Sequence, residues 1–342
     1  MKIAKTLFEG LKKNRLLRPV KPIIETLEGI VLGSPEATSG APHFLDHIEI
    51  KRYMSTVILA MIPATVAAVV FFGWYVLAMI LISYVVGGII EVAFALIRKK
   101  EIEEGFLVTG LIFPLILPPT TPLWVVAVGI AFGVFFGKEV FGGTGRNIFN
   151  PALVGRIFIT IAFPQIMSAT WRMPFSDVIT TATPLAVYRS AQTTVPYLDL
   201  LLGQVAGSTG EVFRIGIIAG AVLLMMTRVS SWRITLSYLG SVALFALIGH
   251  ALGPQTFAPP LFQLLAGSVL FGAVFMATDP VTSPATKPGK FIFGIGCGII
   301  TVLIRTFSGF TEGVMFSIVI MNAFTPLIDN AVVNLKYRPA KR

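Results

Sequence analysis

Apolar residues occur along this chain in long runs, which short polar or basic segments separate. A transmembrane helix needs about 20 apolar residues to cross roughly 30 Å of hydrocarbon. The pattern therefore predicts an all-α integral membrane protein with about ten transmembrane helices. The ten predicted spans are residues 54–72, 74–97, 105–118, 123–137, 151–163, 212–227, 234–253, 261–277, 291–305 and 313–329.

Several of these runs are short or interrupted by proline. Residues 105–118 contain Pro114 and end among further prolines, and residues 151–163 begin at Pro151. Short, proline-interrupted segments are typical of broken helices that line a site instead of facing lipid. We therefore expect some of the ten helices to be broken.

The composition excludes other classes of protein. The 342 residues are 55% hydrophobic and only 13% charged, with a mean hydropathy of +0.82. A soluble domain carries about 25% charged residues, so a soluble globular protein and a disordered protein are both excluded. The formal net charge of +10 does not indicate nucleic-acid binding, because the basic residues flank the apolar runs.

The positions of these basic residues predict the orientation of the chain. If ten spans follow a cytoplasmic N-terminus, 22 of the 27 Lys and Arg residues fall on the cytoplasmic side. This bias follows the positive-inside rule. Both termini are then cytoplasmic, with an N-terminal arm at residues 1–52 and a basic tail at residues 331–342.

Weak internal similarity suggests that the bundle is duplicated. Residues 104–118 and 211–225 each begin with Glu and lead into a further span. Five spans in each half, at residues 53–163 and 212–330, would give the halves opposite topology, and inverted repeats place sites at their interface. The long polar connection at residues 164–211 is predicted to be a functional external loop.

Three carboxylates lie in or at the ends of predicted spans. Glu91 has apolar residues on both sides, whereas Asp279 and Asp329 each end a span. A charged group in hydrocarbon costs several kcal/mol unless it faces a cavity or a partner, so the pattern indicates cation or proton passage. The alternative for Asp279 and Asp329 is an interfacial position, with Asp279 capping a turn before Pro280.

Small and amide side chains provide further candidates. Gly87 and Gly88 would allow a flat ring or a second helix to approach closely. Of these two interpretations, packing of a second helix is the stronger. Asn150 precedes a proline-started helix and is a plausible N-cap, while Asn147 and Asn150 could also contact a planar ligand. Residues 180–184 (Thr-Thr-Ala-Thr-Pro) read in isolation as a turn with free hydroxyl groups.

No metal site is predicted from the ligand residues. The single cysteine, Cys297, lies in an apolar run and is interpreted as a small buried hydrophobe. His43 and His47 are four residues apart, but Pro42 disfavours a helix there and the helical zinc motif is incomplete.

Six segments together resemble a known family of membrane proteins. They are similar to the B subunit of the sodium-translocating NADH:quinone oxidoreductases and to the D subunit of the Rnf ferredoxin:NAD oxidoreductases. The arm at residues 42–54 favours the quinone reductase, whereas residues 279–290 read equally well as the Rnf protein. The segments are residues 137–156, 180–185, 210–216, 227–234, 275–284 and 312–329.

The resemblance implies flavin cofactors. The family joins FMN through a phosphoester to the last Thr of a Ser/Thr-Gly-Ala-Thr motif, which corresponds to Thr183, on the external side. Thr181 stands here where the motif prefers Gly, which bears on recognition by the flavin transferase. A non-covalent riboflavin is also implied, with Asn147 and Asn150 matching its pocket.

The resemblance also implies a substrate, a transported ion and a location. Gly87 and Gly88 match the quinone site, and the acidic residues tied to sodium uptake match Glu91, Asp279 and Asp329. The chain would work in the lipid of a bacterial inner membrane, with other subunits of a respiratory complex, and pass electrons to ubiquinone. Charge on a reduced flavin would be coupled to sodium at Glu91. A secondary transporter or channel without a redox role remains the alternative of another class.

Overall fold

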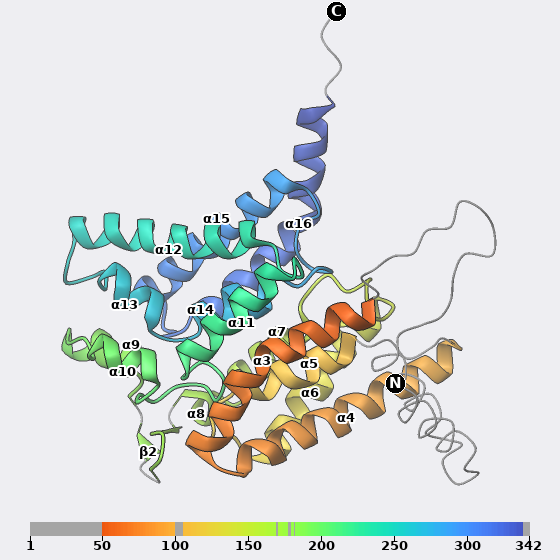
Figure 1. Cartoon of the computed structure of the whole chain (residues 1–342), viewed down its shortest axis with the longest axis horizontal. Helices are drawn as coiled ribbons and strands as arrows, with labels where there is room; N and C mark the ends of the chain where they lie inside the picture. Colours follow the sequence, from red (N-terminus) through yellow and green to blue (C-terminus); the bar gives the residue numbers. More distant parts are fainter. Residues whose placement is uncertain (1–49, 100–104, 169, 177–178, 181, 338–342) are drawn as a thin grey trace, which may run out of the picture.

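The computed structural model describes residues 50–99, 105–168, 170–176, 179–180 and 182–337. Within them the chain is mostly helical, with one short two-stranded hairpin (Figure 1). The arm before residue 50, with its two histidines, and Thr181 lie outside the described residues. The prediction of an all-α membrane protein is confirmed.

Six described helices are long and apolar enough to cross a membrane, and each coincides with a predicted span. The last of them continues to Lys336, into the segment expected as a basic tail. The six are α3 (Ile50–Phe72), α4 (Tyr75–Arg98), α6 (Leu123–Gly137), α12 (Trp232–Leu252), α15 (Lys287–Phe307) and α16 (Val314–Lys336).

The remaining apolar runs form shorter or broken helices, as predicted. Asn150 caps α7 directly before Pro151, and Gly267, with φ of +66°, separates α13 from α14. Broken helices therefore lie in both halves of the chain. The elements are α5 (Gly105–Leu115), α7 (Pro151–Ala162), α11 (Arg214–Met226), α13 (Pro260–Leu265), α14 (Val269–Phe271) and the π-helical turn η3 (Gly272–Met276).

Glycines allow α6 and α7 to cross closely. Gly129, Gly133 and Gly137 recur every four residues on the face of α6 that packs against α7. A Cβ atom at Gly133 would lie 2.4 Å from the carbonyl oxygen of Pro151, and one at Gly155 would lie 2.5 Å from that of Gly129. Small residues at this spacing allow two helix backbones to touch, as in membrane helix pairs.

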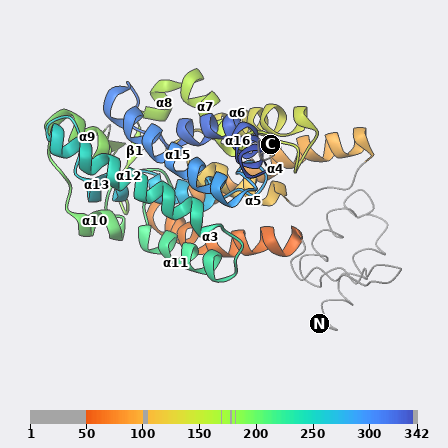
Figure 2. The same cartoon turned by 90° about the horizontal axis from the view of Figure 1, so that it is seen from above.

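The two halves pack through corresponding helices. The first helices of the halves, α3 and α11, lie side by side, and the fifth helices, α7 and α16, are also in contact (Figures 1 and 2). Pairing of equivalent elements is what a two-fold relation between repeats would produce. Their opposite topology stays a prediction.

The connection at residues 164–211 is folded against one end of the bundle. It contains α8 (Pro164–Ser168), the antiparallel strands β1 (Trp171–Arg172) and β2 (Ile179–Thr180), α9 (Pro184–Ala191) and α10 (Tyr197–Leu202). Arg189 at the end of α9 donates to the carbonyl oxygen of Ser308, just beyond α15. The loop is therefore attached to the ends of transmembrane helices.

Candidate functional site

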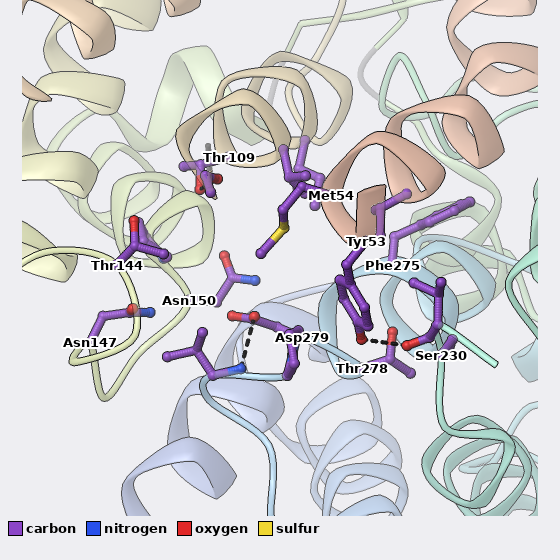
Figure 3. A pocket seen from close by; sticks show the side chains of 18 of the residues that line it. Tyr53, Met54, Thr109, Thr144, Asn147, Asn150, Ser230, Phe275, Thr278 and Asp279 are labelled. Atoms are coloured by element: carbon purple, nitrogen blue, oxygen red, sulfur yellow. Dashed lines mark hydrogen bonds between the residues drawn. The ribbon is translucent and has the colours of Figure 1, made fainter. Parts of the chain in front are cut away.

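A pocket lies between the two halves, at the end of the bundle where α3 begins (Figure 3). The space among its lining residues, open solvent included, is about 680 Å³. Tyr53 and Lys138 line it from the first half, and Thr278 and Asp279 line it from the second. The interface of the halves is where the sequence analysis expected a site.

Both predicted amide residues line this pocket. Asn150 is 5% exposed, and its Oδ1 accepts hydrogen bonds from the backbone N–H groups of Ala152 at 3.1 Å and Leu153 at 3.4 Å. Asn147 donates through Nδ2 to the carbonyl oxygen of Phe149 at 3.1 Å. The N-cap interpretation of Asn150 is confirmed, and a cap at the pocket wall can also contact a ligand.

Two hydroxyl groups in the pocket have no hydrogen-bond partner among the residues that the structure describes. Thr144 Oγ1 and Ser230 Oγ are both buried and make no hydrogen bond within the described part of the chain. Buried polar atoms are nearly always hydrogen-bonded, so these two atoms indicate a polar ligand or bound water. With the amides of Asn147 and Asn150, they form a donor and acceptor set that fits the carbonyl, ring-nitrogen and hydroxyl groups of a flavin.

Asp279 both caps a turn and lines the pocket. Its Oδ1 accepts from the backbone N–H of Val281 at 3.2 Å, and its Oδ2 accepts from Thr282 Oγ1 at 3.1 Å. The capping alternative is therefore correct, and the same carboxylate forms part of the pocket wall.

Glu91 has a partner that the sequence analysis missed. Lys138 Nζ donates to Glu91 Oε1 at 2.5 Å, and the lysine and the glutamate are only 2% and 4% exposed, respectively. Lys138 directly follows a predicted span, as a flanking basic residue would, but it is a buried counter-ion. The sequence does contain one signal for such a pair, a lysine directly after the apolar run of α6. It does not indicate which carboxylate this lysine meets.

Asp329 lies apart from this pair. Its Oδ2 accepts from the backbone N–H of Ala285 at 2.8 Å, and its Oδ1 accepts from Thr286 Oγ1 at 2.5 Å. It thus fastens α16 to the N-terminus of α15. Among the described residues, no group of three or more His, Cys, Asp or Glu side chains is placed to hold a metal ion, so the three candidate carboxylates do not converge.

The two glycines of α4 have different surroundings. A Cβ atom at Gly87 would lie 2.5 Å from Phe106 Cε2 and 3.1 Å from Ile130 Cγ1. A Cβ atom at Gly88 would lie 3.5 Å from the same Phe106 ring, at ordinary contact distance. Gly87 therefore packs against the core, and Gly88 is the member with more room.

This difference predicts unequal effects of adding one methyl group. Gly87→Ala should displace the Phe106 ring and lower the stability of the chain by about 1–3 kcal/mol, the usual cost of overpacking. Gly88→Ala is the matched variant and should leave the melting temperature nearly unchanged. Thermal unfolding of the purified variants compares them, and equal melting temperatures would contradict the packing of Gly87.

Thr183 lies at the other end of the bundle from the pocket. It is half-buried, and its Oγ1 caps α9 by accepting from the backbone N–H of Ala186 at 3.3 Å. The pocket wall includes Asp279 and Val281, which lie just before the start of α15. Helix α9 is bonded to Ser308, just after the end of α15. The 21 residues of α15 span roughly 30 Å. A phosphate on this hydroxyl would meet the N-terminus of a helix, which favours anions.

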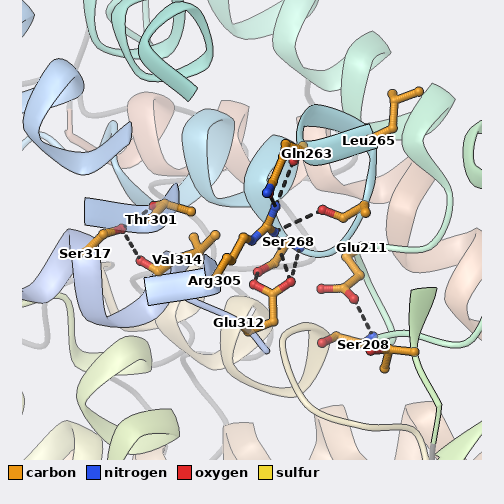
Figure 4. Close-up of polar contacts among 12 residues, drawn as sticks. Ser208, Glu211, Gln263, Leu265, Ser268, Thr301, Arg305, Glu312, Val314 and Ser317 are labelled. Atoms are coloured by element: carbon orange, nitrogen blue, oxygen red, sulfur yellow. Dashed lines mark hydrogen bonds and ion pairs between the residues drawn. The ribbon is translucent and has the colours of Figure 1, made fainter. Parts of the chain in front are cut away.

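A buried ionic cluster near α9 was also missed by the sequence analysis. Arg305 bonds Glu312 at 3.1 Å, and Glu312 accepts from the hydroxyl of Ser268 at 2.7 Å (Figure 4). An added Cβ at Gly267 would meet both ionic side chains and Leu185 of α9, so Gly267 lies between α9 and this ion pair. The cluster comprises Arg156, Glu211, Arg214, Arg305 and Glu312, all except Glu312 less than 9% exposed.

Comparison with known proteins gives one consistent result. Residues 37–338 match the model of the NQR2, RnfD, RnfE family. The chain is 37% identical to the B subunit of the Na(+)-translocating NADH-quinone reductase of Chromohalobacter salexigens, over 92% of this chain and 90% of the relative. It is 44% identical to the protein of the same name from Pseudomonas aeruginosa, over 78% and 70%, and 35% identical to that of Klebsiella pneumoniae, over 94% of each.

Proposed function

The chain belongs to the NQR2, RnfD, RnfE family, and we propose that it is the B subunit of a sodium-translocating NADH:quinone reductase. Such a subunit is a multi-pass membrane component of an oxidoreductase complex. The relatives that carry this name match over most of the chain and of their own length. We further propose that the complex lies in a bacterial inner membrane, with both termini of this chain cytoplasmic.

The pocket between the halves is proposed to hold a non-covalent riboflavin. The observation that carries this proposal is a pair of buried hydroxyls, Thr144 and Ser230, beside Asn147 and Asn150, for which the described part of the chain supplies no hydrogen-bond partner. When bound, a flavin supplies the electron-transfer chemistry. The residues of the chain orient the ring system through the amides and exclude water through the apolar walls.

Thr183 is proposed to carry FMN through a phosphoester. Its hydroxyl stands at the N-terminus of α9, where backbone N–H groups and the helix dipole favour a phosphate. A flavin transferase would attach the group. Thr183 and the pocket lie at opposite ends of α15, so flavins at these two positions would serve electron transfer across the bilayer.

The remaining candidate residues complete the proposal. Glu91 and Asp279 are assigned to sodium passage, and Asp329 supports it by fixing the start of α15. The ubiquinone ring is assigned to the α4 surface at Gly87 and Gly88, where Gly88 offers the room. Oxidation of NADH is assigned to the partner subunits.

The proposal is tested on the purified complex with Asn147→Ala. We expect the wild type to contain extractable riboflavin and to reduce ubiquinone with NADH in a sodium-dependent manner. Asn147→Ala should lose most of the riboflavin, because it removes a pocket amide without touching the Asn150 cap. Asn334→Ala alters an exposed amide on α16 and should retain the flavin fully.

The outcomes also separate the alternatives. A complex that reduces NAD with ferredoxin and ignores quinone would identify the Rnf protein instead. A wild-type chain without any flavin, in cells that supply flavins and the transferase, would favour a secondary transporter without a redox role. Full riboflavin content in Asn147→Ala would contradict the assignment of the pocket.

A further inference from the structure

Lys138 belongs to two sites at once. Its ammonium group pairs with Glu91 Oε1 at 2.5 Å, and its side chain also lines the pocket that contains Asn147, Asn150 and Asp279. Both members of the ion pair are buried, at 2% and 4% exposure. A single cation therefore stands between a membrane-embedded carboxylate and the proposed flavin pocket.

A second ion pair joins the same two elements. Arg98 near the end of α4 bonds Glu139 Oε2 at 2.6 Å, directly beside Lys138 in the sequence. Glu139 begins the short 3₁₀ turn η2 (Glu139–Phe141). Because Arg98–Glu139 already ties α4 to this turn, the attachment does not depend on Glu91–Lys138.

We propose that Lys138 is a tethered cation shared between Glu91 and the occupant of the pocket. Negative charge arriving on that occupant draws the ammonium group away from Glu91, and a sodium ion takes its place at the carboxylate. This inference rests on the proposed function, since it requires a flavin in the pocket and sodium as the transported ion.

The chemistry of lysine suits this exchange. An ammonium group is a compact charge on a flexible four-carbon stem, so it can move between two neighbouring anions while its backbone stays fixed. Sodium, like other hard cations, prefers oxygen ligands, which the Glu91 carboxylate supplies. No covalent bond changes, and Lys138 keeps its proton.

The charges balance in the exchange. The NADH-oxidising partner subunits supply the electron, and one negative charge enters the pocket as one sodium ion enters at Glu91. Opposite charges attract strongly in a medium of low dielectric. Arrival of the electron without sodium, or of sodium without the electron, is therefore unfavourable. Lys138 would thereby make electron arrival and sodium uptake depend on each other.

The test measures binding of radiolabelled sodium to the purified complex in its oxidised and reduced states. In the wild type we expect the reduced complex to bind sodium at least about tenfold more tightly. Lys138→Met keeps a side chain of similar length without the charge, so sodium should reach Glu91 in both states. The affinity of the oxidised complex should then rise about tenfold and equal that of the reduced complex.

A second readout is the midpoint potential of the non-covalent flavin. In the wild type it should rise with sodium concentration, and in Lys138→Met it should be lower and independent of sodium. Lys138→Arg retains the charge and should restore the sodium dependence. Arg98→Met breaks the neighbouring ion pair and should leave this dependence as in the wild type.

The role of Lys138 can still be tested if the Lys138→Met complex fails to assemble. A buried charge left without its partner destabilises a protein, so Lys138→Met is accompanied by Glu91→Gln/Lys138→Met, in which both charges are absent. This double variant should retain the flavin and lose the sodium dependence of its potential. An unchanged dependence in either variant would overturn the role of Lys138.

The same experiment distinguishes failure of the inference from failure of the proposed function. A wild-type complex without non-covalent flavin, or without sodium-dependent quinone reduction, would overturn the proposed function. A wild type with both properties and a Lys138→Met variant that behaves identically would overturn only the shared-cation role.

Discussion

Thr183→Ala is expected to abolish covalent flavin on this chain completely. A phosphoester needs a hydroxyl oxygen, and alanine has none to offer. The substitution also removes the N-cap of α9, which should cost about 1 kcal/mol of local stability. In-gel flavin fluorescence of the denatured chain, from cells that contain the flavin transferase, measures the result directly.

The chain offers a matched control for the loss of the cap. Thr286 is also an N-cap threonine, and its hydroxyl accepts from the backbone N–H of Gly289 at 3.2 Å at the start of α15. Thr286→Ala removes a cap, and with it the hydrogen bond to Asp329, but it leaves the attachment point in place, so it should keep the fluorescent band. A fluorescent Thr183→Ala band would contradict the assignment, and a dark wild-type band would show that Thr181 prevents recognition by the transferase.

Gly133→Ala is expected to destabilise the first half of the bundle strongly. The added Cβ would lie 2.4 Å from the carbonyl oxygen of Pro151 and 3.0 Å from the backbone nitrogen of Gly155. Ordinary overpacking costs about 1–3 kcal/mol. Here the obstacles are backbone atoms, which a rotamer change does not relieve, so we expect at least about 3 kcal/mol.

Separation of α6 from α7 should also affect the pocket. Asn150 stands at the start of α7, so Gly133→Ala should lower both the melting temperature and the riboflavin content. Gly240→Ala is the matched control, because a Cβ at Gly240 of α12 meets no heavy atom within 4 Å and alanine favours helix over glycine. Equal melting temperatures for the two variants would disprove the backbone contact.

The helices themselves could be predicted from local pattern. The predicted spans 74–97 and 123–137 correspond within one residue to α4 and α6, because hydrophobic length alone determines which segment crosses a bilayer. The cap at Asn150 and the break before Pro151 also follow from local rules. The turn cap at Asp279, offered as the alternative to ion passage, follows from local chemistry too, because Asp279 precedes Pro280.

Partners far apart in the sequence could not be predicted. Lys138 and Glu91 are 47 residues apart, and Arg305 meets Gln263 as well as Glu312. A long basic side chain at the end of an apolar run is ambiguous, because it can extend to water or turn inward to a buried carboxylate. Only the packing of α4 against α6, in three dimensions, decides between these two outcomes.

The order in which the chain emerges during synthesis has a consequence for the pocket. The contact of α6 with α7 involves neighbouring segments and can form early, since local contacts form before distant ones. The pocket wall, by contrast, extends from Tyr53 to Val281 and is incomplete until most of the second half is inserted. Riboflavin retention would therefore indicate that the chain has been inserted at least as far as the end of the pocket wall. Chains truncated before Thr278 should contain no riboflavin when they are purified from the membrane.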